Sequence, residues 1–461
     1  MKLTNLIIVI ALVALCVLGW GTLASGNASK EAEYESYIAQ AEDCLNRRLY
    51  QRAIENYLSA LGGRADEDIY IDIADAYSLR YEEAPEETFS DYLSFLKTAL
   101  GAFPGSQTLV DHMVSLCLEN EDYRTLYPYL KKAVASGCDG EPMLALYARA
   151  RYDYSLRGNT FQAIVDSGTG IYTVLTNRGW NMYTMSNGYQ LTDDWDYVGP
   201  DGSGVTVITG EDSRIVHISD SMVLGIFPSV VTAAGIFGEG LIPVQIAGGE
   251  YGYGYYNDYA DYQFGSYGYA GTFQNGLAAV EEDGRWMLVN PEGGVERDGF
   301  ERIVTDLAGR YLVDGTILVR ESGAYVMYDS KWKRQAELSC DEVDILSEDG
   351  MIAFRSGGKW GFADMDGNIV IEPAFATARS FSNGLAAVQN SDGLWGFVDR
   401  TGRLVIDYTF TGAGYLSSEG ACPVRVDEPL TAPVYDSKTG AEITIPEQWR
   451  LLSLTNGITK D

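Results

Sequence analysis

One sequence pattern occurs twice in the chain and constrains the fold more than any other feature. KWGFADMDGNIVIEPAF occupies residues 359–375, LWGFVDRTGRLVIDYTF occupies residues 394–410, and nearly half of the aligned positions are identical. A second pattern, FxNGLAAV, occurs at 273–280 and 381–388, and the distance between its two copies corresponds to three repeat units. Self-similarity at a fixed period is the signature of a repeat architecture. We therefore interpret the repeated Trp as a structural residue.

The Trp position recurs through the second half of the chain at a nearly regular spacing. We place its copies at Trp180, near Ile215, and at Tyr251, Trp286, Tyr325, Trp360, Trp395 and near Ala432. Glycine follows the Trp at two of these copies, as Gly361 and Gly396. Eight copies at this period predict a β-repeat domain over residues 165–447.

Each unit predicts three or four short strands. Runs such as GLAAV, WGFVD and LVID are rich in β-branched or aromatic residues and are separated by polar loops. Asp-Gly at 366–367 and Asp-x-x-Gly at 399–402 favour tight turns with positive φ. Such a unit cannot bury both faces alone, so its neighbours must cover the large Trp and Phe side chains. We expect a β-propeller of seven or eight blades, with an open β-solenoid as the alternative.

The repeat resembles the WG-repeat family, which is named for its Trp-Gly pair. Residues 360–361 and 395–396 carry the resemblance most clearly, and Trp286 carries it without the glycine. The resemblance implies a repeated β architecture. It implies no particular activity, because a repeat of this kind defines a fold more clearly than a function.

Residues 31–158 predict helices that pair with one another, because apolar residues recur there at spacings of three and four. The first pair resembles a tetratricopeptide repeat, in which small residues let two antiparallel helices pack closely. The positions that carry this resemblance are Tyr37, Ala41, Ala53, Tyr57 and Ala60. It implies a concave face that binds a peptide or protein partner. The alternative is that the helices act as a rigid spacer. Together with the β-repeat domain, they predict an α + β multidomain protein.

The N-terminal residues 1–28 contain an uncharged apolar stretch that runs from Leu6 to Ala24. The length of this stretch is close to that of a membrane-spanning helix. We interpret residues 1–28 as a single-pass membrane anchor, with a cleaved signal peptide as the alternative. Either interpretation places the bulk of the chain outside the cytoplasm. An anchor would hold it at the cell membrane of a bacterial envelope, and a cleaved signal peptide would leave it secreted. At the other end, we expect residues 448–461 to form a tail.

Charge and motif content exclude several classes of function. The formal charge is −32, whereas nucleic-acid binding requires a basic surface. No CxxC pair occurs among the six Cys, and the two His are far apart in sequence, so we expect no metal and no cofactor. The motifs GxxxxGK[ST], GxSxG and HExxH are absent, and we expect no catalytic residue. Residues 364–367, with Glu372, are read as a turn and not as a calcium loop.

The stretch GEYGYGYYNDYADYQFGSYGYAG, residues 249–271, is the best candidate for ligand contact. It holds eight Tyr and six Gly, a composition that gives adaptable contact surfaces, and Tyr rings can also stack on sugars. We interpret it as a lengthened loop between two units, or as an insert that packs on its own array. The candidate contact residues are Tyr251, Tyr253, Tyr255, Tyr256, Tyr259 and Tyr262.

These features together favour a non-enzymatic, membrane-tethered, extracytoplasmic scaffold that binds other proteins. The alternative is a propeller at the cell envelope that binds or cleaves carbohydrate. The Tyr-rich stretch would carry the second function, and the broad repeat surfaces would carry the first.

Overall fold

The computed structural model describes residues 30–62, 66–120, 122–138, 140–248, 252–427, 434–435, 442–443 and 448–458. The chain divides into two compact units, Met1–Arg151 and Tyr152–Asp461. The predicted anchor, residues 1–28, lies outside the described residues. Within the described part, no helix is both long enough and apolar enough to cross a membrane.

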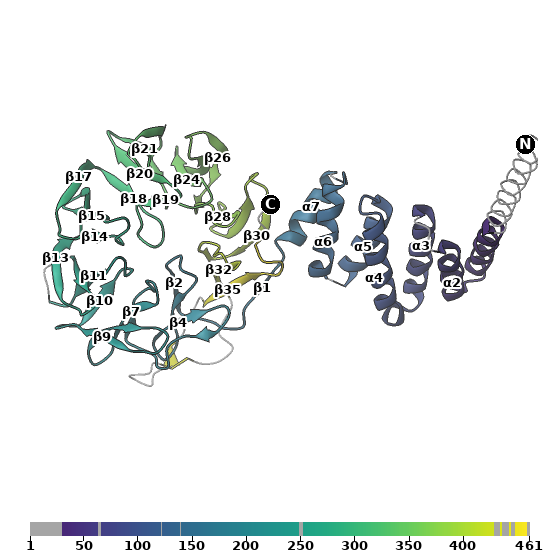
Figure 1. The fold of residues 1–461 in the computed structure, drawn as a ribbon, viewed down its shortest axis with the longest axis horizontal. Coiled ribbons are helices and arrows are strands. Elements are labelled where there is room, and N and C mark those ends of the chain that lie inside the picture. Colours follow the sequence, from purple (N-terminus) through teal and green to yellow (C-terminus); the bar gives the residue numbers. More distant parts are fainter. Residues whose placement is uncertain are drawn as a thin grey trace, which may run out of the picture. The chain divides into compact units, whose positions relative to one another are not determined.

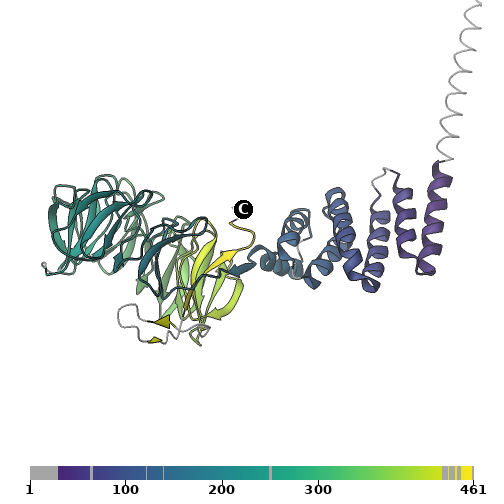
Figure 2. The ribbon, with the colours of Figure 1, turned by 90° about the horizontal axis from the view of Figure 1, so that it is seen from below.

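The first unit is a row of helices, each packed against the next along the chain (Figure 2). Residues 30–46 are helical, and six helices follow: α2 (Tyr50–Leu61), α3 (Glu67–Glu83), α4 (Pro85–Ala102), α5 (Gln107–Glu119), α6 (Tyr123–Ala135) and α7 (Glu141–Arg151). The predicted small residues Ala41, Ala53 and Ala60 are buried together with Tyr57, and Tyr37 is half-buried. The helical segment is confirmed, and its resemblance to tetratricopeptide repeats stays a prediction.

The second unit is a ring of eight antiparallel sheets, or blades, within the described residues (Figure 1). Blade 1 comprises β2 (Ala163–Asp166), β3 (Tyr172–Leu175), β4 (Trp180–Thr184) and β5 (Gly188–Tyr189), and blade 2 comprises β6 (Tyr197–Val198), β7 (Val205–Thr209), β8 (Ser213–His217) and β9 (Val223–Ile226). Blade 3 comprises β10 (Val231–Ala234), β11 (Leu241–Ile246), β12 (Tyr253–Asn257) and β13 (Tyr262–Tyr267), and blade 4 comprises β14 (Tyr269–Ala270), β15 (Ala278–Glu282), β16 (Arg285–Val289) and β17 (Val295–Phe300). The predicted β-propeller is confirmed, and the open solenoid is not what forms.

Blades 5 to 8 complete the ring. Blade 5 comprises β18 (Arg302–Val304), β19 (Leu312–Val313), β20 (Thr316–Glu321), β21 (Ala324–Asp329) and β22 (Arg334–Leu338), and blade 6 comprises β23 (Glu342–Val343), β24 (Met351–Ser356), β25 (Lys359–Asp364) and β26 (Ile369–Phe375). Blade 7 comprises β27 (Thr377–Ala378), β28 (Leu385–Gln389), β29 (Trp395–Asp399) and β30 (Leu404–Phe410), and blade 8 comprises β31 (Gly412–Ala413), β32 (Ala421–Val426), β35 (Gln448–Leu454) and β1 (Tyr154–Leu156). A two-stranded hairpin, β33 (Val434–Tyr435) with β34 (Glu442–Ile443), falls between β32 and β35 in the sequence.

Blade 8 joins the two ends of the propeller and corrects three predicted boundaries. Its outer strand β1 comes from the segment after α7 and pairs with β35, so the helical domain ends at Arg151 and not at residue 158. Residues 448–461 are not a tail, since β35 is the third strand of this blade. The β domain therefore extends beyond 165–447 at both ends. Trp449 pairs with Arg425 as Trp395 pairs with Gln389, so it holds the repeated Trp position.

The backbone geometry of the outer strand explains why glycine follows the repeated Trp. Opposite Gly396 the outer strand inserts two extra residues, because Trp395 pairs with Phe410 whereas Phe397 pairs with Ile406. A β-carbon on Gly396 would lie 2.6 Å from the carbonyl oxygen of Ile406. Gly361 meets the same bulge in blade 6, where a β-carbon would lie 2.5 Å from a carbonyl oxygen. Glycine is therefore required where the outer strand bulges by two residues.

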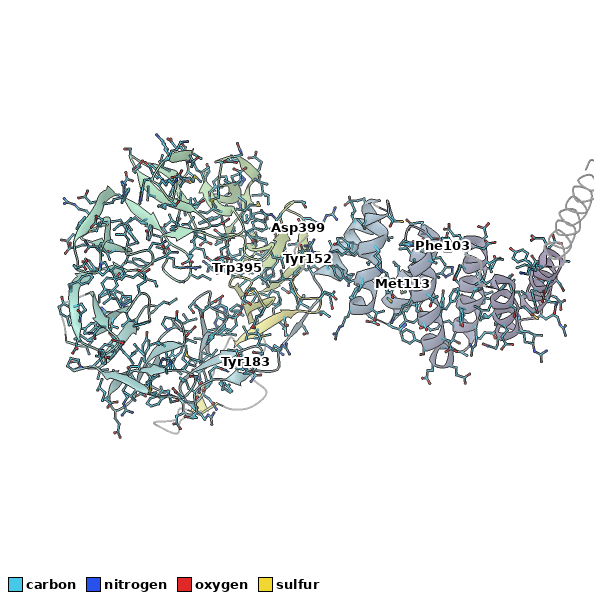
Figure 3. The ribbon with its side chains drawn as sticks, in the orientation of Figure 1. Phe103, Met113, Tyr152, Tyr183, Trp395 and Asp399 are labelled. Carbon is cyan, nitrogen blue, oxygen red and sulfur yellow. The ribbon has the colours of Figure 1, made fainter. Side chains whose placement is uncertain are left out.

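The repeated Asp that ends the third strand makes a turn and supports the turn interpretation of residues 364–367. The Oδ1 atom of Asp364 accepts hydrogen bonds from the backbone N–H groups of Asp366 and Asn368, at 3.0 and 2.8 Å. Asp399, which lies at the far end of β29 from Trp395 (Figure 3), accepts from Thr401 and Arg403 in the same way. These are Asx-type turns, which use the carboxylate to satisfy backbone donors. No group of three metal-ligating side chains occurs among the residues that the structure describes.

Candidate functional site

Tight turns between the first and second strands of the blades gather at one end of the ring. In the FxNGLAAV pattern the Asn-Gly pair forms this turn, and both residues have positive φ at Asn275–Gly276 and Asn383–Gly384. Positive φ at both central positions defines a type I′ turn, for which Asn-Gly is preferred. Because the blades share one strand order, these turns lie at the same end of the ring, which we call its mouth.

Polar side chains fasten the two Asn-Gly turns to the neighbouring blades. Glu239 accepts hydrogen bonds from the backbone N–H groups of Asn275 and Gly276, both at 2.8 Å. Asp349 accepts from the N–H of Gly384 at 2.6 Å. The Asn383 amide donates to the carbonyl of Leu416 at 2.8 Å. Such contacts hold neighbouring turns in fixed positions around the mouth.

One inner loop of blade 5, residues 306–310, reaches across the mouth, and we call it the axial loop (Figure 1). A β-carbon on Gly168 of blade 1 would lie 3.3 Å from Cβ of Leu307. Blades 1 and 5 are opposite in an eight-bladed ring, so this contact spans the axis. The loop is tied to blade 4, where the backbone N–H of Thr272 donates to Gly309 at 3.1 Å. On the other side, Arg310 lies 3.5 Å from Glu348 of blade 6.

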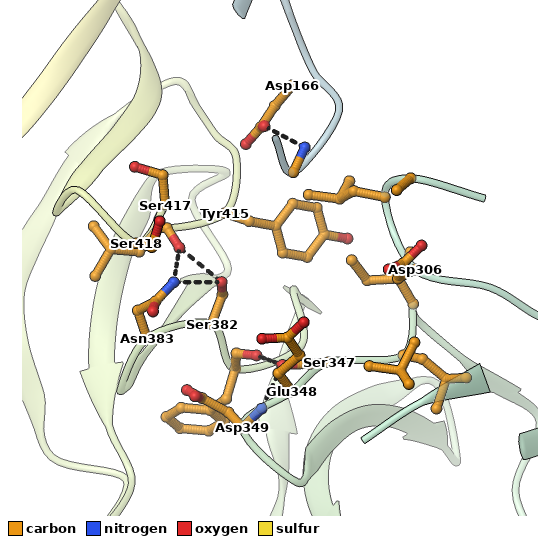
Figure 4. Close-up of a pocket in the computed structure, with 18 of the residues that line it drawn as sticks. Asp166, Asp306, Ser347, Glu348, Asp349, Ser382, Asn383, Tyr415, Ser417 and Ser418 are labelled. Atoms are coloured by element: carbon orange, nitrogen blue, oxygen red, sulfur yellow. Dashed lines mark hydrogen bonds between the residues drawn. The ribbon is translucent and has the colours of Figure 1, made fainter. Parts of the chain in front are cut away.

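The axial loop divides the mouth into two pockets. The larger, of about 300 Å³, is polar and is lined by the inner loops of blades 1, 5, 6, 7 and 8 (Figure 4). Its main polar residues are Asp166, Asp306, Arg310, Ser347, Glu348, Asp349, Ser382, Asn383, Tyr415, Ser417 and Ser418. The smaller, of about 220 Å³, lies between blades 1 and 5 on the other side and is lined mostly by small residues with Tyr253 and Tyr269. Both pockets share Asp166 and Leu307.

Most carboxylates of the polar pocket already have partners within the protein. Arg310 binds Asp306 at 2.6 Å, and Asp349 caps the turn at Gly384. Tyr415, which lines the pocket, donates its hydroxyl to the buried Asp344 at 2.6 Å. Burial raises the pKa of Asp344, and the hydrogen bond from Tyr415 opposes that rise. The pocket is therefore a pre-formed polar surface whose charges mainly hold the loops in place.

Asp166 is the exception, since its carboxylate accepts one hydrogen bond, from the N–H of Gly168 at 2.9 Å. Neighbouring atoms exclude water from this carboxylate and raise its pKa from 3.8 to about 6, against the effect of the Gly168 N–H. Because the folded pKa lies above the unfolded one, folding favours the protonated form. The resulting stabilisation is complete below pH 4 and is lost as the pH rises through 6.

We predict that Asp166→Asn raises the melting temperature at pH 7.5 and leaves it unchanged at pH 4. The variant keeps an acceptor for the Gly168 N–H and cannot ionise. The free energy of unfolding at pH 7.5 should rise by at most about 2 kcal/mol, because solvent at the mouth screens part of the effect. Thermal unfolding at the two pH values measures it. Asp364→Asn is the control of opposite sign: hydrogen bonds from Asn368 and Asp366 outweigh burial and lower the pKa of Asp364, so its loss should destabilise at neutral pH. A destabilised Asp166→Asn at pH 7.5 would refute the prediction.

The structure places five of the predicted repeat positions away from these pockets, whereas Tyr253, which holds the position in blade 3, lines the smaller one. Each of the five lies at or near the start of the third strand of its blade, in the set Trp180, Trp286, Tyr325, Trp360 and Trp395. None of them lines either pocket. Trp395 and Tyr325 are buried, in agreement with a structural role.

The Tyr-rich stretch is not a lengthened loop, and that prediction was wrong. Its described part forms strands β12 and β13 of blade 3 and β14, the first strand of blade 4. Tyr255 and Tyr256 are buried and cannot contact a ligand, whereas Tyr259 and Tyr262 are exposed. Tyr251 lies outside the described residues, and the register assigns the Trp position to Tyr253: Val244 pairs with Gly254 as Val388 pairs with Gly396. The strands explain part of the Tyr content, since Tyr255 packs in the core shared with blade 4 and Tyr256 in the core shared with blade 2.

Sequence reasoning missed the axial loop and the polar pocket. One signal was present, because the spacing from Trp286 to Tyr325 is longer than the spacing from Trp360 to Trp395. The additional residues belong to the segment that contains the axial loop. Nothing in the sequence marked Asp166, since its environment depends on the opposite side of the ring.

Comparison with known proteins agrees with the repeat pattern. The family described as "WG containing repeat" matches residues 266–286, 360–394 and 395–428. No curated protein matches the chain in sequence.

Among solved structures, the chain is similar to BamB from Moraxella catarrhalis, with 10% identity, 65% of this chain and 99% of that chain covered, and a TM-score of 0.43. It is also similar to the computationally designed Ika8 protein, with 12% identity and a TM-score of 0.41; the match covers 64% of this chain and 97% of the Ika8 chain. A third similar structure is the WD40 β-propeller domain of Doa1, with 10% identity and a TM-score of 0.30; the match covers 66% of this chain and 96% of the Doa1 chain.

Proposed function

We propose that the WG repeats of this chain build a propeller that serves, together with the helical unit, as a protein-interaction scaffold. In this proposal the chain performs no bond chemistry of its own. Its N-terminal residues 1–28 hold it at the membrane, or direct it across, with the bulk outside the cytoplasm. The helical row and the propeller each offer a broad surface to partners.

The use of the pocket's carboxylates carries the proposal. Asp306 is bound by Arg310, and Asp349 caps a turn of the next blade. A carboxylate that is fixed by internal hydrogen bonds positions loops well and acts poorly as a free acid or base. Asp306 and Asp349 are therefore suited to holding the loops of the mouth in a fixed shape that a partner can bind.

Carbohydrate binding is the second candidate, and the polar pocket is what favours it. Three Ser hydroxyls (382, 417 and 418), the Asn383 amide and the Tyr415 ring line a space of about 300 Å³. Hydroxyl and amide groups that converge on a small pocket are suited to the hydroxyls of a sugar. The pocket thus replaces the Tyr-rich stretch as the site that this alternative would use.

Affinity capture distinguishes the two functions. The full chain and the propeller fragment 152–461, which has its own core and includes β1, are each incubated with solubilised envelope extract and with a glycan panel. We expect both to retain a defined protein and neither to retain a glycan. Retention of a glycan that Asn383→Ala abolishes, with no protein retained by either chain, would replace the scaffold proposal with the carbohydrate one.

A further inference from the structure

The fourth strand of each blade has a free edge, and half of these edges carry protective residues. Such edges invite pairing with another chain unless charges or Pro block them. The long outer strands β17, β22, β26 and β30 contain such residues, namely Glu296, Arg297, Asp298, Arg334, Glu337, Glu372, Pro373 and Asp407. The outer strands β1 (YSL), β5 (GY), β9 (VLGI) and β13 (YQFGSY) contain none, and of these β9 is the one made mainly of aliphatic residues.

Exposed apolar side chains gather along this unprotected edge. On β9 and just before it, Met222, Val223 and Ile226 are 51%, 43% and 57% exposed. In the neighbouring blade, Tyr259 and Tyr262 are 67% and 58% exposed. A β-carbon on Gly225 would lie 2.3 Å from the Tyr259 carbonyl carbon, so β9 and the turn of blade 3 lie against each other. We call these five side chains the rim patch.

The rim patch rests on a rigid support. The Tyr262 ring meets Tyr256 edge to face at 5.6 Å, and Tyr256 meets Phe227 at 5.3 Å. Tyr256 and Phe227 are buried in the core that joins blades 2 and 3. The Tyr262 ring is thus held in place by packed aromatic neighbours, which lowers the entropy cost of binding a partner at this side chain.

Charge selects the partner. Residues 215–284 contain no Lys and no Arg but eight Asp or Glu, and Arg214, which pairs with Ile226, is already bound by Asp212. Three of these acids, Asp220, Asp258 and Asp261, directly flank the rim patch in sequence. A second copy of the chain would bring a further charge of −32 to this edge and is disfavoured. A segment with Lys or Arg beside its apolar residues is complementary to it.

We propose that β9 takes up an extended, apolar and basic segment of a partner protein as an additional strand of blade 2. This proposal rests on the scaffold function. Backbone hydrogen bonds along the free edge of β9 provide the pairing, as in β-strand addition. The rim patch covers the apolar side chains of the segment, and the flanking acids bind its Lys or Arg.

A short fluorescent peptide that alternates Val and Lys serves as the probe, and its binding to the full chain is measured by anisotropy. Ile226→Lys should weaken binding about tenfold or more, because it puts a like charge on the pairing edge. Ile369→Lys on β26 is the matched control: it adds the same charge at a side chain that is 50% exposed and should change binding little. Both variants should unfold at the temperature of the parent chain.

A second arm needs no variant. The same peptide with N-methyl groups along one edge keeps its charge and side chains but loses the donors for strand pairing, and it should bind about tenfold more weakly. Equal weakening by the two Lys variants, or undiminished binding of the N-methylated peptide, would overturn the proposal. A protein captured equally by the parent chain and by Ile226→Lys would leave the scaffold function standing and refute this surface. Absence of any captured protein would refute the scaffold function itself.

Discussion

A propeller fragment that begins at residue 159 is expected to unfold roughly 10 °C below one that begins at residue 152. The shorter fragment lacks β1, which supplies the outer strand of blade 8 and pairs with β35 from Tyr154↔Leu454 to Leu156↔Leu452. It also loses the buried Tyr152 and the contact of Tyr154 with Phe410, whose ring centroids are 5.9 Å apart. Removal of these aromatic contacts exposes apolar surface and costs several kcal/mol.

Calorimetry of the two fragments measures the difference, and a peptide spanning residues 150–158 provides the control. Added in excess, this peptide should raise the melting temperature of the 159–461 fragment by mass action and leave that of the 152–461 fragment unchanged. Equal melting temperatures for the two fragments would show that β1 does not close the ring.

Gly396→Ala is expected to destabilise the propeller by about 3 kcal/mol. The added β-carbon would lie 2.6 Å from the Ile406 carbonyl oxygen, so the bulge of β30 must shift away from β29. The strain cannot be relieved by a side-chain rotation, because the atom that it meets is backbone. Denaturant unfolding of the 152–461 fragment measures the loss.

The control for this substitution is Gly158→Ala in the same unit. No atom lies within 4 Å of a β-carbon at Gly158, so its stability should change by less than about 0.5 kcal/mol. Blade 5 shows why the effect is local: Val326 stands at the corresponding position, and Tyr325↔Leu338 and Val326↔Glu337 pair without a bulge. A Gly396→Ala variant as stable as the parent would refute the steric account of the Trp-Gly pair.

Sequence periodicity predicted the propeller because each blade repeats the same local chemistry. Asn-Gly turns, the bulge glycines and the Asx turns at Asp364 and Asp399 are decided by neighbours in sequence, so one unit reveals them. The ends of the ring could not be predicted in this way. Pairing of Tyr154 with Leu454 joins the two ends of the propeller unit, and a strand as short as β1 has no period of its own.

The candidate site was less predictable for a related reason. The polar pocket depends on the contact of Leu307 with Gly168 across the ring, which no local pattern encodes. The Tyr-rich stretch was misassigned because its composition resembles that of a binding loop, whereas the β-propensity of Tyr places it in β12 and β13. Two of its residues, Tyr259 and Tyr262, nevertheless stand exposed on the rim patch.

Photo-crosslinking in intact cells that produce the full chain tests the scaffold proposal most directly. A photoreactive amino acid replaces Ile226 on the rim patch, Asn383 in the polar pocket, or Ile369 as the control, one position at a time. We expect a discrete adduct with one protein from position 226 and none from position 369. Carbohydrate adducts from position 383, with no protein adduct from any position, would contradict the scaffold function and leave carbohydrate binding in its place.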